Sequence, residues 1–431
     1  MISLVRLACV NFDVDSETGS YGLLSRDRNQ RSFWYRWGGG TAVLFAYTHF
    51  SHDLCNGLLI ALLPLIKENL GLSYLQSGLL LSALTITSGL SQFLGGWIGD
   101  RMSRQIVIAI GLAGIGLASL AVGMISSYYL LLIILIIMGI FAGAYHPSAV
   151  SVLSSHIERA RRGKAFAFHM VGGSIGYAAG PFLGGLIAEL LGWRFAFIIL
   201  SIPILTAIPL VLNKFREQRH LKDSQKANPL SASDVIASHP RQKSTGIIQI
   251  LQPMAVIVSL AILTQLIGGT AMVFIPIYLV DKHYITPTYA AMLMGVTRAG
   301  GIAGSLFGGW LSDRWGRKNT IFLSLAAIGP ILYILTILPF NAGLIVILIV
   351  FGLFMYMRQA AVQPFLMDNV PSRIRATIFG IYFGLGMEGM SLMQPVAGHF
   401  MDIFGIIAIF QAIAWISVVV SVLSLLLVRK A

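Results

Sequence analysis

The chain has 431 residues, of which 56% are hydrophobic and only 11% charged, and its mean hydropathy is +0.80. This composition excludes an ordinary soluble protein and predicts a polytopic membrane protein. The net charge of +13 could suggest nucleic acid as a partner, but the positions of the basic residues explain it otherwise. Two cysteines, Cys9 and Cys55, are too few for a disulfide framework or a metal cluster, and we expect no metal and no cofactor.

The chain begins with a polar segment, residues 1–40, that lacks the apolar core of a signal peptide and is typical of a cytoplasmic tail. Twelve apolar stretches follow, each close to the roughly 20 residues that a bilayer-spanning helix requires. A polar segment, residues 214–249, separates them into two sets and is typical of a linker. The sequence therefore predicts two six-helix bundles, at residues 41–213 and 250–428. The stretches begin near residues 41, 74, 105, 128, 165, 193, 250, 288, 320, 343, 376 and 406.

The basic residues predict the orientation. If the N-terminus is cytoplasmic, 25 of the 30 Lys and Arg residues lie on that side of the membrane and three lie outside. This asymmetry is the positive-inside signal, so both termini should face the cytoplasm. The last two, Arg298 and Arg358, fall inside predicted spans. We expect a monomeric, multi-pass protein of the cell inner (plasma) membrane, surrounded by lipid bilayer and not bound to nucleic acid.

The two halves contain an internal repeat. Residues 95–104 recur 213 positions later as 308–317, each time after the second span of a bundle. Parallel halves with a site between them near the midplane are a known transporter plan. Both copies resemble the signature loop of the major facilitator superfamily, although Ser103 stands where the second copy has glycine. The resemblance covers roughly residues 41–428.

This resemblance implies an all-α fold of twelve transmembrane helices in two pseudo-symmetric bundles. It also implies that the two loops act in gating, and the spacing allows i, i+4 ion pairs within each loop. We expect these pairs to be Asp100–Arg104 and Asp313–Arg317. The gating residues are Gly96, Asp100, Arg101, Arg104, Gly309, Asp313, Arg314, Gly316 and Arg317.

Glycines recur every four residues in the fifth span, from Gly172 onward, and form a smooth ridge for close helix packing. The segment is similar to a motif associated with drug/proton antiporters of the superfamily, which favours export, although close packing alone also explains a ridge. Residues 49–53 and 145–147 resemble the fosmidomycin-resistance branch of exporters. However, the arginine expected about four residues before Gly139 is Leu135 here. The antiporter-motif residues are Gly176, Gly180, Pro181, Gly184 and Gly185.

Ionisable side chains inside the membrane are costly and commonly functional. In the first span His49, His52, Asp53 and Asn56 share one helical face, at i, i+3, i+4 and i+7. A buried carboxylate flanked by imidazoles can exchange protons near neutral pH. Asp53 is thus the first candidate for proton coupling, and a structural hydrogen-bonded cluster is the alternative. The other coupling candidates are His52, His146 and Glu388.

Arg358 and Glu388 are each 15 residues from Arg373, in the loop between their spans, so a buried ion pair between them is expected. Alternatively, Arg358 binds an anionic substrate group, since a guanidinium holds carboxylate or phosphate with two hydrogen bonds. Arg298 has no evident partner in the sequence and is a second candidate. His169 is expected near the cytoplasmic surface. The substrate-binding candidates are Arg298, Arg358, Gln359, His49, Asn56 and Gln363.

No catalytic motif or nucleotide-binding glycine loop is present, so we do not expect an enzyme or an ATP-driven pump. The leading hypothesis is a secondary active transporter that works by alternating access and couples protons to efflux of small, anionic or amphiphilic compounds such as drugs. One alternative is a uniporter or proton symporter that imports an organic anion. Another is a non-transporting receptor or scaffold, against which the glycine ridge and the intramembrane charges argue.

Overall fold

The computed structural model describes residues 39–157, 161–225, 255–370, 382 and 384–427. Within these ranges the regular secondary structure is helical, without a strand, which agrees with the predicted all-α fold. Of the predicted tail, only Gly39 and Gly40 fall among the described residues, at the start of the first helix.

The first bundle contains the first six predicted spans. Its first span is broken at Gly57, which lies between two helices that pack end to end. Its last helix continues through residues 214–225, which the sequence assigned to the linker. The helices are α3 (Gly39–Asn56), α4 (Leu58–Leu70), α5 (Tyr74–Arg101), α6 (Arg104–Met124), α7 (Tyr128–His156), α8 (Arg162–Leu191), α9 (Trp193–Leu200) and α10 (Ile202–Gln225).

The second bundle contains the remaining spans. Its elements are α12 (Ala255–His283), α13 (Pro287–Trp315), α14 (Arg317–Ile337), α15 (Ala342–Asn369), the π-helical turn η1 (Gly384–Glu388), α17 (Gly389–Phe404) and α18 (Ile406–Leu427). Among the described residues, ten helical stretches are long and apolar enough to cross a membrane. The other two predicted spans correspond to α5 and to η1 with α17. α5 is rich in Ser, Thr and Gln, and the described part of α17 is only 16 residues long.

Glycines bring α3 and α8 into direct backbone contact. A Cβ on Gly172, Gly176 or Gly180 would lie 2.1–2.5 Å from a backbone carbonyl oxygen of α3. The predicted ridge therefore packs on α3 with no side chain between the two backbones. The second bundle has the same kind of contact between α13 and α15. A Cβ on Gly300 or Gly304 of α13 would lie 2.3 or 2.1 Å from a backbone carbonyl oxygen of α15.

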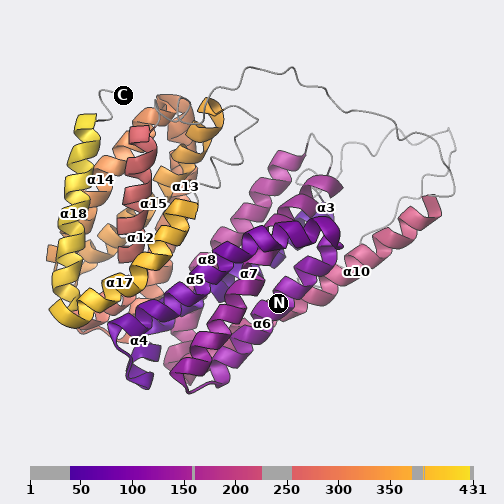
Figure 1. The fold of residues 1–431 in the computed structure, drawn as a ribbon, viewed down its shortest axis with the longest axis horizontal. Coiled ribbons are helices and arrows are strands. Elements are labelled where there is room, and N and C mark those ends of the chain that lie inside the picture. Colours follow the sequence, from indigo (N-terminus) through magenta and orange to yellow (C-terminus); the bar gives the residue numbers. More distant parts are fainter. Residues whose placement is uncertain (1–38, 158–160, 226–254, 371–381, 383, 428–431) are drawn as a thin grey trace.

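The two bundles converge where α17, α4 and α5 meet, and they diverge toward the opposite end (Figure 1). We call the convergent end the closed end. There Asp402 of α17 accepts the backbone N–H groups of Tyr74 and Leu75 at 2.8 and 2.9 Å, which caps the start of α5. The Tyr74 hydroxyl also donates to Asp281 of α12 at 2.6 Å. These bonds join one bundle to the other.

Candidate transport site

Asp53 lies between two imidazoles of its own helix. The His49 Nε2 atom is 3.3 Å from Asp53 Oδ2, and the His52 Nδ1 atom is 2.7 Å from Asp53 Oδ1. Both histidines are buried, whereas the Asp53 side chain remains 19% exposed. Each carboxylate oxygen therefore faces one imidazole nitrogen, and the predicted polar stripe of the first span forms a compact cluster.

The second nitrogen of each imidazole fixes its tautomer. His49 Nδ1 lies 2.9 Å from the carbonyl oxygen of His169, and His52 Nε2 lies 3.2 Å from that of Ala142. A carbonyl oxygen can only accept, so both of these nitrogens must bear hydrogen. Each contact with Asp53 therefore becomes a hydrogen bond only when an additional proton is present. One extra proton satisfies one contact and gives a neutral cluster, and two satisfy both contacts.

Asn56 offers His52 an alternative partner. Its Nδ2 atom lies 3.3 Å from His52 Nδ1, the same nitrogen that faces Asp53. When His52 carries one proton, this nitrogen has a lone pair that can accept from Asn56. When His52 carries two, the nitrogen donates to the carboxylate. The geometry thus allows the ring to exchange partners as it gains or loses a proton.

Two further histidines complete the cluster. The ring of His146, from α7, lies 4.6 Å from that of His52 and 5.3 Å from that of His49. His169 of α8 stacks on His49 at 4.2 Å, and its Nδ1 atom donates to Phe45 O at 2.9 Å. His169 is 1% exposed, and its predicted position near the cytoplasmic surface stays a prediction. The glycine ridge brings α8 close enough to α3 for the two rings to stack.

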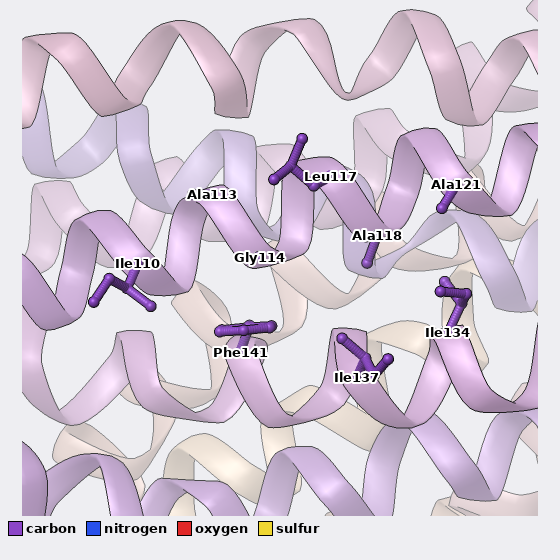
Figure 2. A pocket seen from close by; sticks show the side chains of 9 residues that line it. All are labelled: Ile110, Ala113, Gly114, Leu117, Ala118, Ala121, Ile134, Ile137 and Phe141. Atoms are coloured by element: carbon purple, nitrogen blue, oxygen red, sulfur yellow. The ribbon is translucent and has the colours of Figure 1, made fainter.

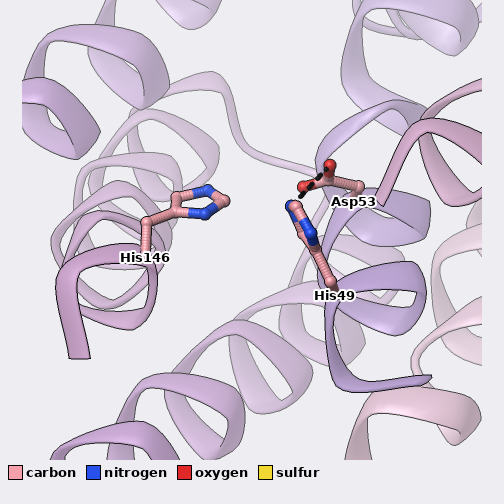
Figure 3. Close-up of side chains that lie close together, drawn as sticks. All are labelled: His49, Asp53 and His146. Atoms are coloured by element: carbon pink, nitrogen blue, oxygen red, sulfur yellow. Dashed lines mark ion pairs between the residues drawn. The ribbon is translucent and has the colours of Figure 1, made fainter. Parts of the chain in front are cut away.

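A cation would find ligands in the same place. His49, Asp53 and His146 each offer a ligand atom within 4.8 Å of the others, and the His146 ring points across the gap toward α3 (Figure 3). Each Asp53 oxygen already faces an imidazole nitrogen at 3.3 Å or less. These distances also suit protons shared between the carboxylate and the imidazoles, and the expectation of no metal stays a prediction.

Arg298 lies at the boundary between the bundles. Its Nη1 atom donates to the Tyr356 hydroxyl of α15 at 2.6 Å, and its guanidinium lies 4.0 Å from the ring centroid of Tyr177 in α8. No carboxylate among the described residues, Asp53 and Glu388 included, forms an ion pair with it. Sequence reasoning missed both tyrosines. Tyr356 could have been found from the sequence of α15, because Tyr356, Gln359 and Gln363 lie on one helical face at i, i+3 and i+7.

Arg358 has a different environment. It is 1% exposed inside the second bundle and donates to Ala261 O and the Tyr382 hydroxyl, each at 3.1 Å, and to the Gln265 side chain. The predicted ion pair with Glu388 is not formed in this structure. Its Nη atoms donate to α12 and to Tyr382 instead, while its buried Nε atom has no hydrogen-bond partner among the described residues. Both residues can lie at the same depth while their helices present them to different neighbours.

Glu388 faces the first bundle. A Cβ on Gly89 of α5 would lie 1.3 Å from the Glu388 Oε1 atom, so the carboxylate occupies the notch that this glycine leaves. Glu388, the last residue of η1, thus packs against α5 and is not among the cluster residues around Asp53. Its predicted coupling role stays a prediction.

The second signature loop forms the predicted Asp313–Arg317 ion pair. Arg317 Nε also donates to Asp368 at the end of α15, at 3.2 Å, which sequence reasoning did not foresee. Gly316 has a φ of +99°, which favours glycine. Ser103, at the corresponding position of the first copy, has a φ of −60° and needs no glycine. The surroundings of Gly96 and the side chain of Asp100 lie outside the described part, so the Asp100–Arg104 pair stays a prediction.

Comparison with known proteins agrees with this architecture. The model of the Major Facilitator Superfamily matches residues 45–392 and 257–431. The chain belongs to the Major Facilitator Superfamily. Like other members of that superfamily, it is a multi-pass membrane protein that transports small molecules.

Individual members of the superfamily match most of the chain. The fosmidomycin resistance protein of Escherichia coli (strain K12) is 22% identical over 369 residues, which are 84% of this chain and 87% of that protein. The cis,cis-muconate transport protein of Acinetobacter baylyi (strain ATCC 33305 / BD413 / ADP1) is 22% identical over 393 residues, which are 86% of this chain and 89% of that protein. A bacterial homologue of the human lysosomal transporter Spinster has been solved in an inward-facing and unoccupied conformation. It matches with a TM-score of 0.72 at 16% identity, and the match covers 92% of this chain and 96% of that one. These proteins are membrane transporters rather than enzymes.

The motif similar to that of antiporters in the superfamily packs α8 on two sides. Gly176 and Gly180 contact α3, as described above, and Gly184 faces Leu58 of α4. Gly185 faces the other bundle, where its Cβ would lie 2.7 Å from Thr288 O. Pro181 lies next to the break at Gly57 in the first span. The motif therefore connects the helix of Asp53 to the bundle boundary.

A cavity of about 370 Å³ lies between α6 and α7, and no residue of the Asp53 cluster lines it (Figure 2). All of its lining side chains are apolar, so it offers no hydrogen-bond partner to a polar compound. The lining residues are Ile110, Ala113, Gly114, Leu117, Ala118, Ala121, Ile134, Ile137 and Phe141.

Proposed function

We propose that this transporter works by alternating access and couples proton exchange at the Asp53 cluster to the export of small compounds. The observation that supports this most is the buried carboxylate with an imidazole nitrogen facing each oxygen. Both imidazoles have their other nitrogen committed to a backbone carbonyl. Proton gain or loss at this cluster therefore changes hydrogen bonding directly.

Loss of a proton would disturb the helix that holds the cluster. With fewer protons, at least one imidazole nitrogen presents a lone pair to a carboxylate oxygen, and this repulsion favours a rearrangement of α3. The backbones of α3 and α8 are in direct contact through Gly172, Gly176 and Gly180, so movement of one helix must affect the other. Because α8 also packs against α13 of the second bundle, proton exchange is connected to the relative position of the bundles.

Export is the direction we favour. The motif from Gly176 to Gly185 resembles that of antiporters, and one relative is named a fosmidomycin resistance protein. Under this proposal protons enter from outside as the compound leaves. The Asp402 and Tyr74 bonds at the closed end, which the distribution of basic residues places outside, are among those that must break for release.

The test uses proteoliposomes with an imposed pH gradient and a fluorescent reporter of internal pH. A panel of small compounds, including phosphonates and amphiphilic dyes, is added one at a time. We expect a transported compound to discharge the gradient and to accumulate on the acidic side. Accumulation that is independent of the pH gradient for every transported compound would contradict the proton-coupled mechanism.

A second candidate is import of an organic anion together with protons. Arg298 favours it, because no described carboxylate neutralises this buried cation, and one relative is named a cis,cis-muconate transport protein. The two candidates differ in how pH affects substrate affinity. In an antiporter protons and substrate compete, so affinity falls as the pH falls. In a symporter they bind together, so affinity rises as the pH falls.

A further inference from the structure

Arg298 is a buried cation that the protein orients without neutralising. It lies near the middle of α13 (Pro287–Trp315) and is 8% exposed. The ion pairs recorded among the described residues involve His49, His52 and Arg317, but not Arg298. A guanidinium within the membrane region is costly unless it meets an anion, a cavity or strong acceptors. Its recorded contacts are two tyrosines.

Glycines of α13 form the walls around this arginine. One turn before it, a Cβ on Gly295 would lie 2.9 Å from the Ala178 carbonyl oxygen of α8. One turn after it, a Cβ on Gly301 would lie 2.7 Å from the Tyr356 ring. The first glycine lets the bundles approach closely at Arg298, and the second makes room for the tyrosine beside it. The site is thus built by residues of both bundles.

We propose that Tyr177, Arg298 and Tyr356 form a subsite for one oxyanion group of the transported compound, a carboxylate, phosphonate or phosphate. The Tyr356 hydroxyl accepts a hydrogen bond from Arg298, so its own proton is free to be donated to the same anion. The Tyr177 ring covers one face of the guanidinium and leaves its edge for hydrogen bonding. The inference rests on the proposed transport function and is independent of the direction of transport.

Arg358 provides an internal comparison. Its two Nη atoms have three acceptors within the second bundle, its Nε atom has no partner among the described residues, and its side chain is almost completely buried, so its hydrogen bonds stay within one bundle. Arg298 instead faces α8 across the boundary that alternating access must rearrange. Of the two arginines that the sequence suggested for an anionic substrate, the structure favours Arg298.

The test measures binding of small anions to the purified protein in nanodiscs of zwitterionic lipid. The probes are phenylphosphonate and benzoate, and benzamide serves as the neutral analogue of benzoate. We expect both anions to bind, and Arg298→Gln to weaken their binding at least about tenfold while affinity for benzamide is unchanged. Arg298→Lys should recover only part of the affinity, because an ammonium cannot make the two-pronged contact. The control is Arg194→Gln, whose guanidinium binds Asn69 and Ser126 away from the site.

A milder variant protects the test from misfolding. Tyr356→Phe removes only one hydroxyl and should weaken binding of the anions several-fold while the melting temperature stays close to that of the parent. If neither anion binds the parent, or if Arg298→Gln and Tyr356→Phe bind the anions as well as the parent does, the subsite is wrong.

A second arm separates substrate from lipid headgroups, which share the same chemistry. Nanodiscs that contain phosphatidylglycerol should leave the affinity for the probes unchanged, and competition by this lipid would overturn the assignment to the substrate. Anion binding without proton-driven transport would contradict the proposed coupling and leave the subsite standing. Proton-driven transport with no anion binding would contradict the subsite and leave the proposed coupling standing.

Discussion

The two carboxylate oxygens of Asp53 are divided between His49 and His52, at 3.3 and 2.7 Å. Since each imidazole already donates its other N–H to a backbone carbonyl, the three side chains gain hydrogen bonds as they gain protons. The other titratable or charged groups near them include Cys55, Tyr145, His146, His169 and Tyr177, with Arg298 next to Tyr177.

The cluster should make stability depend on pH. Hydrogen bonds that require an extra proton are present at low pH and are lost when the cluster gives up its protons at higher pH. We therefore expect the melting temperature of the parent to exceed that of His49→Gln by more at pH 5.5 than at pH 8. The matched control is His399→Gln, at an exposed position on α17, which should show no such pH-dependent difference. A difference for His49→Gln that is constant with pH would indicate packing alone.

The glycine ridge should not tolerate a methyl group where α3 and α8 touch. In Gly176→Ala the new Cβ would lie 2.1 Å from the Phe50 carbonyl oxygen, so the helices must separate. Overpacking of this kind typically costs about 1–3 kcal/mol. Gly163→Ala, on the same helix but in open space, is the matched control and should be neutral or stabilising. Thermal melting in detergent measures both, and equal melting temperatures would refute the close contact.

Arg358 and Glu388 should behave as independent residues. Arg358→Gln removes donors from three acceptors in the second bundle, at a cost of about 1–3 kcal/mol for a buried group left unsatisfied. Glu388→Gln should be tolerated, because its carboxylate has no arginine partner among the residues that the structure describes. In a thermal-shift series the double variant should melt like Arg358→Gln. Recovery of stability in the double variant would mean that the two charges do pair.

Asp402 should hold the closed end together. Asp402→Asn removes the negative charge that caps α5 through the N–H groups of Tyr74 and Leu75. We expect the population to shift toward a state open at that end. Spin labels at the exposed positions Glu68 and Tyr284, one in each bundle, would report the change as a longer distance distribution. An unchanged distribution would mean that other contacts maintain closure.

The sequence was sufficient for the repeat and the all-α superfamily fold, because span length, basic loops and glycine spacing are local patterns. It also placed His49, His52 and Asp53 on one face, since a helical period determines this. Sequence patterns did not predict which side chains of different helices face one another, because this depends on how each helix is rotated in the assembled bundles. His169 proved buried, Arg358 turned toward α12, and the Tyr177 and Tyr356 contacts to Arg298 arise only after the bundles meet.

Protons exchanged at Asp53 should drive transport, and transport by Asp53→Asn in proteoliposomes measures this dependence. Asparagine keeps the shape of the side chain but cannot hold a carboxylate charge between the two imidazoles. We predict that Asp53→Asn loses accumulation driven by a pH gradient, yet still exchanges labelled for unlabelled compound across the membrane, as His399→Gln and the parent do. If Asp53→Asn accumulates the compound against its gradient as well as the parent does, Asp53 is structural and proton exchange at this residue does not drive transport.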